Sequence, residues 1–312
     1  MSEASGSPRS TGAHSLTSNM MTPKQYLLIN LSKMIVELVG TAVLGIFYLT
    51  VGGSQAGMLL GYWIITLFGV AISGAHFNPC VTLACMLRKN SSFGTRRLRG
   101  ILYIAAQMAG GLIAAIVSKF LLNQIDGSNL AISPKMKNAD GINEYRFFSS
   151  LISECAGTAY FVFLIMICTD KKTQFSTDRV INCFIMASSY VASRLMAGSH
   201  MVTVLYSDPE QTVDGVLMAR VANHAVGPLL NPALAFGQML LSFDFKFILQ
   251  YFFMPLAGSA IALVFYEFVF VKSQEYLEDD TSSAGDNKEL DIPDIPDSPP
   301  KKKADPEATS SD

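Results

Sequence analysis

Two short segments of the chain share a glycine placed four residues before an Asn-Pro pair and continue into apolar residues. The pairs, each with the residue that follows, are Asn78-Pro79-Cys80 and Asn231-Pro232-Ala233. An Asn side chain caps the free backbone N–H groups at a helix start, and Pro suits the first turn because no donor is needed there. Each pair is therefore predicted to begin a helix whose N-terminal end offers N–H donors and a positive dipole to a polar molecule.

The setting of these two helix starts is apolar. Half of the residues are hydrophobic and only 15% are charged. Apolar segments of about the length that spans a bilayer lie at 28–50, 57–74, 98–122, 147–168, 179–199 and 247–271. A helix that begins at membrane depth is tolerated only where its irregular backbone lines a cavity or is buried in protein. Two such starts indicate a pore through an all-α membrane protein.

The ends of the chain are polar. We expect residues 1–27 and 273–312 to be disordered tails, and residues 1–22 contain no hydrophobic region of a cleavable signal peptide. Basic residues are concentrated near 88–99, and six spans bring both termini to the same side. The positive-inside rule makes that side cytoplasmic. No basic face is interleaved with aromatic residues, so nucleic acid is not an expected partner. The plasma membrane is favoured over an internal one.

The chain also repeats on a larger scale. The pattern Glu37–Thr41 recurs as Glu154–Thr158, and Gln107–Gly110 has a looser counterpart in Pro255–Gly258. The halves, about 28–122 and 147–271, each contain three spans and one Asn-Pro segment. Because three is odd, the second half must be inverted relative to the first, as in a class of transport folds. The predicted channel domain therefore covers residues 28–272.

On these motifs the sequence resembles the aquaporins of the major intrinsic protein family over about residues 28–271. The specific matches are Ser73–Pro79 with Val81–Ala84, Tyr103 with Ala106-Gln107, and Asn231–Ala233 with Phe236-Gly237. The resemblance implies six tilted transmembrane helices and two half-helices that meet at the Asn-Pro motifs. It also implies a homotetramer, each subunit having its own pore, that conducts water passively and needs no cofactor.

The chemistry of such a pore follows from the residues. Asn78 and Asn231 are expected to offer side-chain N–H groups to a passing oxygen, and the two positive helix ends oppose cations and interrupt a proton wire. By resemblance, Glu37 and Glu154 each accept bonds from a nearby loop and brace a half-helix. His76 is expected at the cytoplasmic vestibule, in a structural role favoured over pH gating.

Two departures distinguish the chain from most of this family. Cys80 stands where Ala is usual, and Leu234 stands where most members have an Arg at the outer constriction; both are similar to the divergent superaquaporin branch. By resemblance, the selectivity filter comprises Met58, Tyr190, Pro228 and Leu234. A fifth span at 199–222 in place of 179–199 would remove Tyr190 from the filter. The inserted stretch 200–224 either returns a positive charge from Arg220 or Arg194 to the mouth or has no contact with the pore.

The same residues bear on the substrate and on other classes of function. Ala235, where glycerol channels tend to carry Asp, favours water, whereas the missing Arg favours small neutral solutes such as glycerol. A broad solute pore and a gated or structural protein with little flux are the alternatives. A coupled transporter needs an ion site that the spans lack. No catalytic triad or metal-ligand cluster is evident, so neither an enzyme nor a metal site is expected. The five cysteines are expected to be thiols, with Cys80 the candidate for mercurial sensitivity.

Overall fold

The computed structural model describes residues 23–51, 54–89, 93–126, 135–137, 143–145, 147–198 and 228–284, and divides the chain into two compact units, 1–271 and 272–312. In chain order the elements of the first unit are α1 (Pro23–Val51), α2 (Gln55–Val70), α3 (Pro79–Leu87), α4 (Phe93–Asp126), β1 (Lys135–Lys137), β2 (Asn143–Tyr145), α5 (Phe147–Thr169), α6 (Arg179–Gly198), α7 (Pro232–Ser242), η1 (Leu249–Phe253), α8 (Met254–Phe265) and η2 (Tyr266–Phe270). The helix α9 (Val271–Ala284) lies almost entirely in the second unit.

The predicted spans are confirmed as helices, with shifted ends. Within the described ranges, five helical stretches are long and apolar enough to cross a membrane, and α2 is an apolar helix of 16 residues. That length is about 24 Å, less than a bilayer core. Helix α2 stops at Val70, four residues before the predicted end at 74, because the chain turns at 71–73 and Gly74 has a φ of +96°. The link between α4 and α5 also contains a small antiparallel pair, with Met136 opposite Glu144.

The two Asn-Pro segments begin short helices, as the sequence predicts. Asn78 is the N-cap of α3 and Asn231 is the N-cap of α7, and each side-chain oxygen accepts a bond from the N–H two residues on, over 2.8 and 3.0 Å. The residue before each Asn has a positive φ, 49° at Phe77 and 54° at Leu230. Side chains other than Gly rarely adopt this left-handed conformation. The turn into each half-helix is therefore held by its surroundings.

The repeated glycines explain how those turns are held. The ring of Phe77 lies against Gly40 on α1, and the side chain of Leu230 lies against Gly157 on α5, where a Cβ would collide with it. Gly110 on α4 meets the Leu38 carbonyl of α1 in the same way. Its counterpart Gly258 on α8 meets the carbonyl of Cys155 on α5 in the same way, although Pro255–Gly258 matches Gln107–Gly110 only loosely in sequence. Small residues let helices approach closely in a membrane, so both halves use one packing scheme.

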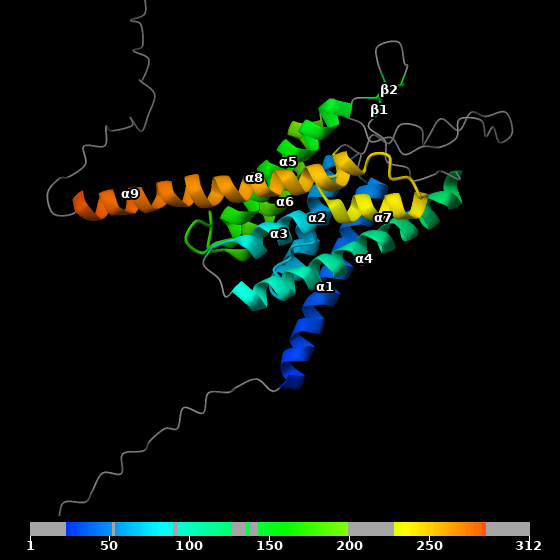
Figure 1. Cartoon of the computed structure of the whole chain (residues 1–312). Helices are drawn as coiled ribbons and strands as arrows, with labels where there is room; N and C mark the ends of the chain where they lie inside the picture. The colour runs from blue at the N-terminus through cyan, green and yellow to red at the C-terminus, as the bar shows by residue number, and fades with distance from the viewer. Residues whose placement is uncertain are drawn as a thin grey trace, which may run out of the picture. The chain divides into compact units, whose positions relative to one another are not determined.

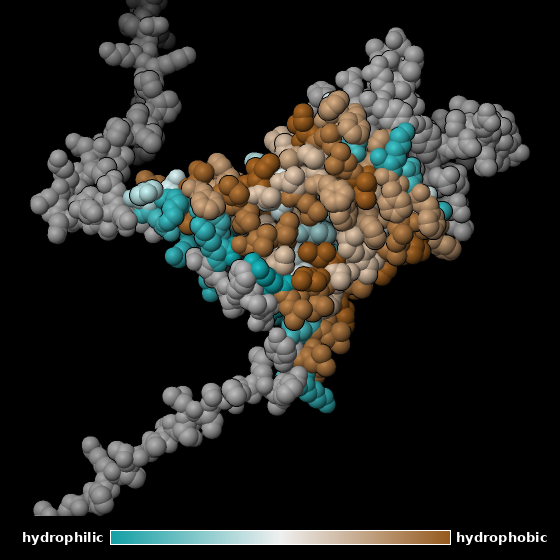
Figure 2. Space-filling view, viewed as in Figure 1, coloured by the Kyte–Doolittle hydropathy of each residue, from teal (hydrophilic) through white to brown (hydrophobic). Residues whose placement is uncertain are grey.

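The helices of the first unit pack in two related groups. Helix α4 packs against α1 and against α7, and Figure 1 shows α4 and α7 running side by side; α8 packs against α5 and α3. Helices α2 and α6 close the bundle between the groups. Large apolar side chains remain exposed on the outward faces, as the brown surface in Figure 2 shows, and they include Ile64, Phe120, Ile152 and Phe265. An exterior of this kind suits contact with lipid.

Only part of each predicted tail belongs to the residues that the structure describes. Residues 1–22 and 285–312 lie outside them, as do the inserted stretch 200–224 with Arg220 and most of the alternative fifth span at 199–222. Helix continues to Ala284, beyond the predicted start of disorder at 273. The reason is local: the segment from Lys272 contains good helix formers, and Lys272 pairs with Glu275 one turn on.

Candidate functional site

The two half-helices meet at their N-termini and are bonded to each other. The amide nitrogen of Asn78 donates to the carbonyl of Leu230 over 2.8 Å, and that of Asn231 donates to the carbonyl of Phe77 over 3.0 Å. Both Asn side chains are buried. Because a primary amide has two N–H groups, each Asn can hold the opposite loop with one and offer the second to another oxygen. The junction therefore combines two fixed donors with two positive helix ends.

A buried carboxylate braces each turn, at the positions the resemblance implies. Glu37 on α1 accepts the N–H groups of His76 and Phe77 over 3.0 and 2.8 Å. Glu154 on α5 accepts those of Leu229 and Leu230, both over 2.8 Å. These bonds satisfy backbone donors that have no partner inside a helix. Both carboxylates therefore have a structural role as acceptors of backbone hydrogen bonds.

The first brace carries an additional side chain that the second lacks. The amide of Gln107 on α4 donates to Glu37 and to the hydroxyl of Thr82, each over 2.8 Å. That hydroxyl in turn donates to the carbonyl of Asn78 and lies 3.1 Å from Nδ1 of His76. A continuous polar network therefore runs from α4 to the first half-helix.

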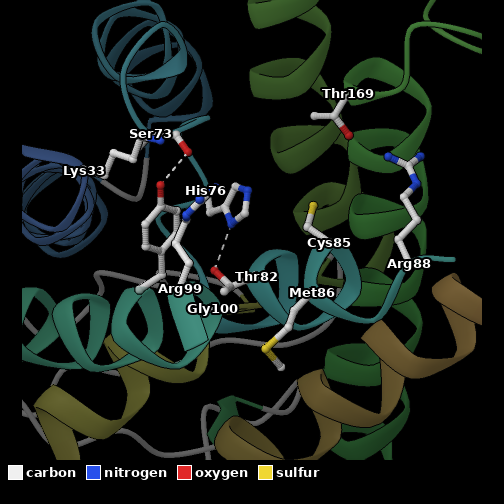
Figure 3. A pocket seen from close by; sticks show the side chains of 11 residues that line it. Lys33, Ser73, His76, Thr82, Cys85, Met86, Arg88, Arg99, Gly100 and Thr169 are labelled. Atoms are coloured by element: carbon white, nitrogen blue, oxygen red, sulfur yellow. Dashed lines mark hydrogen bonds between the residues drawn. The ribbon is translucent and has the colours of Figure 1, made fainter. Parts of the chain in front are cut away.

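A cavity of about 280 Å³ lies beside this network (Figure 3). Its lining comes from α1, the turn after α2, α3, the start of α4 and the end of α5, and consists of Lys33, Ser73, His76, Thr82, Cys85, Met86, Arg88, Arg99, Gly100, Tyr103 and Thr169. The ring of His76 meets that of Tyr103 edge-on at 5.4 Å, and the Tyr103 hydroxyl donates to the carbonyl of Ser73. His76 therefore lines this cavity with its ring against that of Tyr103.

Arg88 closes the far side of this cavity. It donates to the carbonyl of Met166 and pairs with Asp170 over 3.4 Å. Burial acts to raise the pKa of Asp170, but the Lys172 N–H, the Tyr266 hydroxyl and the Arg88 charge outweigh it and hold that pKa below its usual value. The guanidinium also lies over the Tyr266 ring, 4.5 Å from its centre. Arg88 thus links the end of α3 to the end of α5 and to Tyr266 of η2.

A second arginine is buried at the opposite end of the bundle. Arg194 on α6 is 2% exposed and its Nε donates to the carbonyl of Pro228 over 3.2 Å. Its guanidinium lies over the ring of Tyr48 at 4.8 Å and that of Tyr190 at 5.8 Å. A buried guanidinium of this kind is a fixed positive charge with several donors. It follows one helical turn after Tyr190, towards the end of α6.

The four residues expected to form the filter are all buried, but their side chains have different surroundings. Tyr190 donates its hydroxyl to the carbonyl of Leu229 over 3.0 Å, and Pro228 is bonded to Arg194. Leu234 lies against α1, where a Cβ added at Gly45 would be 2.7 Å from its Cδ2. Met58 is fully buried in the same apolar core on α2. Tyr190 and Pro228 are therefore linked through Arg194, while no bonded contact joins Met58 or Leu234 to them in the described chain.

Three aromatic rings pack together between the bracing helices. The rings of Tyr62 on α2 and Tyr190 on α6 have centres 5.0 Å apart, and Phe161 on α5 is 6.3 and 5.2 Å from them. All three side chains are fully buried. The Tyr190 hydroxyl donates a hydrogen bond to the carbonyl of Leu229, which lies two residues before Asn231. This aromatic cluster (Tyr62, Phe161 and Tyr190) therefore narrows the bundle beside the junction.

Helix α1 contacts the cavity, the first brace, Leu234 and Arg194 in turn, so its residues show the order of these features along the helix axis. Lys33 lines the cavity, Glu37 braces the first turn, Gly45 faces Leu234, and the ring of Tyr48 supports Arg194. From Lys33 to Tyr48 the helix rises roughly 22 Å. The Asn junction thus lies between a cavity at one end and a buried guanidinium at the other.

The site offers hydrogen-bond donors and positive charges. Within the described ranges, no cluster of three His, Cys, Asp or Glu side chains is found that could hold a metal. The five cysteines, all of them described, form no disulfide. Cys80 is buried at the start of α3, whereas Cys85 lines the cavity, so a mercurial in the cavity meets Cys85 and not Cys80.

Sequence reasoning missed several of these residues as parts of a site. Arg194 lies within a predicted span, and an ionisable residue in a span signals function by default. It was considered only as one of two charges returned by the inserted stretch. Gln107 belongs to a repeat and to a family match in the sequence, but neither indicates that it bonds the carboxylate of Glu37. The aromatic cluster gave no signal, because single aromatic residues on three apolar helices do not reveal that they meet.

The family model described as Major intrinsic protein matches residues 54–203, from the start of α2 past the end of α6. Aquaporin-1 of Homo sapiens is 25% identical over 264 residues, which cover 80% of this chain and 84% of that protein. Aquaporin TIP1-1 of Arabidopsis thaliana is 25% identical over 213 residues, 68% and 69% of the two chains. Among solved structures, the aquaglyceroporin from Plasmodium falciparum matches with a TM-score of 0.48 at 17% identity, over 79% of this chain and 99% of its own.

Proposed function

We propose that this chain, whose residues 54–203 match the model of the major intrinsic protein family, is an integral multi-pass membrane channel of that family, not an enzyme, and that it conducts water passively. The pore passes the junction of its two half-helices. The observation that carries this proposal is the reciprocal bonding of Asn78 and Asn231 to the opposite loops. It fixes two amide donors side by side on the axis, where a water molecule can bind without being held tightly.

The same junction excludes protons. Both helix N-termini point to one place, and their combined positive ends raise the energy of any cation there. A water molecule that accepts bonds from both amides turns its own hydrogens outwards on either side. A hydrogen-bonded chain through the pore is therefore interrupted at this point.

Arg194 provides the cation at the outer constriction that Leu234 cannot. It is buried, bonded to the Pro228 carbonyl and supported by the rings of Tyr48 and Tyr190. Water is accordingly the main substrate. Small neutral solutes such as glycerol pass only to the extent that Leu234, in place of Arg, widens this constriction.

A second candidate, a gated pore with little flux at rest, is favoured by the aromatic cluster. Its three rings and both Asn side chains are almost inaccessible to water. In this alternative the cluster must rearrange before water reaches the junction. The wild-type permeability measured below decides between the two.

The assembly and location rest on the resemblance and on the charge pattern. We place both termini in the cytoplasm and the protein in the plasma membrane, as a homotetramer with one pore per subunit. The apolar outward faces support the membrane setting and leave a surface on which subunits can pack. The vestibule with His76 then opens to the cytoplasm, and Arg194 faces the outside.

Stopped-flow light scattering on proteoliposomes tests the proposal. Wild-type vesicles are expected to shrink several-fold faster than empty ones in an impermeant osmolyte, and to take up little glycerol. A pH-sensitive dye inside the vesicles should report no added proton leak. Folded protein whose vesicles shrink no faster than empty ones would contradict an open water channel and favour the gated alternative.

Two substitutions assign the outer constriction. Arg194→Gln should raise glycerol uptake several-fold while water permeability persists, because it removes the fixed charge and keeps an amide donor. Leu234→Arg should lower glycerol uptake, with Arg194→Lys as the control that keeps the charge. Unchanged glycerol uptake in Arg194→Gln would show that this arginine takes no part in selection.

A further inference from the structure

The cavity at the cytoplasmic end has an unusual lining for an entrance that passes neutral molecules. It holds three basic side chains, Lys33, Arg88 and Arg99, and no carboxylate belongs to its lining. Figure 3 shows Lys33 and Arg99 on the same side of the cavity as His76, and Arg88 on the other side with Thr169. The positive charge thus surrounds the space.

The charges are not equally compensated. Arg88 pairs with Asp170 and donates to Met166. In contrast, neither Lys33 nor Arg99 is paired with a carboxylate in the part of the chain that the structure describes. The Nε of Arg99 is covered by protein and has no hydrogen-bond partner there. A covered guanidinium nitrogen without a partner costs free energy, and an anion in the cavity would remove that cost.

Three hydroxyl groups of the lining already donate hydrogen bonds to backbone carbonyls. The Tyr103 hydroxyl donates to the Ser73 carbonyl, the Thr82 hydroxyl to that of Asn78, and the Thr169 hydroxyl to that of Ile165. The charged donors left for a ligand are the cationic groups of Lys33 and Arg99. Arginine supplies a fork of N–H groups and lysine a point charge, the pair that suits phosphate oxygens.

We propose that this cavity binds a phosphate group, with Arg99 and Lys33 as its two cationic ligands. A phosphate monoester carries nearly two negative charges at neutral pH, which matches two uncompensated cations better than a single carboxylate does. The volume of about 280 Å³ leaves room for the group together with water. The phosphate belongs either to a soluble anion or to a lipid headgroup of the cytoplasmic leaflet.

Binding here would regulate flux, a consequence that rests on the proposed function. The cavity reaches Thr82, one helical turn from Asn78, whose carbonyl that residue bonds. A phosphate held by Arg99 therefore stands in the route from the cytoplasm to the junction. Water permeability should fall as the cavity fills, while binding itself needs no open pore.

The test measures binding first and flux second. Isothermal titration of the full chain in detergent with inorganic phosphate, at constant ionic strength against chloride, should show one site. Arg99→Gln and Lys33→Gln should each weaken binding about tenfold or more. The control is Arg97→Gln, on the same helix but exposed and outside the cavity, which should bind as wild type does. Arg99→Lys serves if Arg99→Gln does not fold.

The outcomes separate the two sources and the two proposals. Slower water flux with inorganic phosphate in plain vesicles assigns a soluble anion. Slower flux only in vesicles containing a phosphoinositide, again absent in Arg99→Gln, assigns a headgroup. Binding without any flux in wild type would contradict the water channel and leave the phosphate site standing. No heat of binding and no phosphoinositide effect, or equal binding in wild type and Arg99→Gln, would overturn the site.

Discussion

At the scale of single residues, the proposed water channel depends on a few side chains that lie close to the Asn junction. The amides of Asn78 and Asn231 each hold the opposite loop, so their positions are fixed before any water arrives. Donors fixed in this way do not have to reorganise on binding. The neighbouring side chains then decide how much space a molecule has beside those donors.

Phe161 is the residue of the aromatic cluster whose change is the simplest to interpret, because it has no hydroxyl. Phe161→Leu removes ring volume next to Tyr62 and Tyr190. We expect higher water permeability and measurable glycerol uptake in proteoliposomes. Phe163→Leu, on the same helix but in contact with Phe265 and Phe270 instead, is the control. Equal permeability of Phe161→Leu and wild type would show that the cluster does not limit flux.

Mercurial sensitivity belongs to the same scale. Cys85 lines the cavity, whereas Cys80 is fully buried behind it. Inhibition of water flux by a mercurial should therefore be lost in Cys85→Ser and retained in Cys80→Ser. The sequence alone suggested the reverse, because Cys80 follows the motif. Loss of inhibition in Cys80→Ser alone would restore that first assignment.

At the scale of elements, each half-helix depends on a brace from a neighbouring span. Each turn contains a residue with positive φ, Phe77 or Leu230, and two backbone N–H groups that a carboxylate accepts. Strain of this type persists only where the surroundings hold it. The glycines at 40 and 157 give the strained residue space, and the carboxylates give its backbone partners.

Replacing either brace should destabilise the whole bundle. Glu37→Gln and Glu154→Gln each leave one oxygen to accept two N–H groups and remove the charge. The expected loss is about 1.5–3 kcal/mol for each charged bond lost, seen as a lower melting temperature in detergent. Glu275→Gln, at an exposed position of α9, is the matched control. A melting temperature like that of wild type for both brace variants would contradict the bracing role.

At the scale of the whole molecule, inverted repetition brings the two half-helices to one point from opposite sides. Each half has three spanning helices and one half-helix, so the second half enters the membrane in the opposite direction. One entrance is consequently lined by the cationic cavity and the other by Arg194. The two mouths therefore differ in chemistry although the halves share their packing.

The topology has a direct test. In the proposed topology, six crossings put both ends of the chain on the cytoplasmic side. Epitope tags at the two termini should bind antibody only after cells are permeabilised, whereas a tag inserted between α4 and α5, in the 127–134 stretch, should be accessible on intact cells. A terminal tag that binds antibody without permeabilisation would overturn the orientation and, with it, the cytoplasmic position of the cavity.

The sequence by itself determined the features that depend on residues close together in the chain. Helix starts at Asn78 and Asn231, the apolar spans, and the inverted halves follow from capping residues, hydropathy and repeated motifs within a few turns of chain. The repeat even indicated Glu37 and Glu154 as equivalent. Boundaries were less certain, since the turn after Val70 depends on the conformation of Gly74.

Only the tertiary structure decided which distant residues share a space. Arg194 reaches the Pro228 carbonyl across 34 residues, and the aromatic cluster joins three separate helices. The cationic cavity likewise draws on five segments of the chain. Hydropathy and periodicity place a side chain on a face of its own helix, but the rotation and spacing of packed helices decide what that face meets. Those are fixed by the close contacts at glycines such as Gly110 and Gly258, which act between elements far apart in sequence.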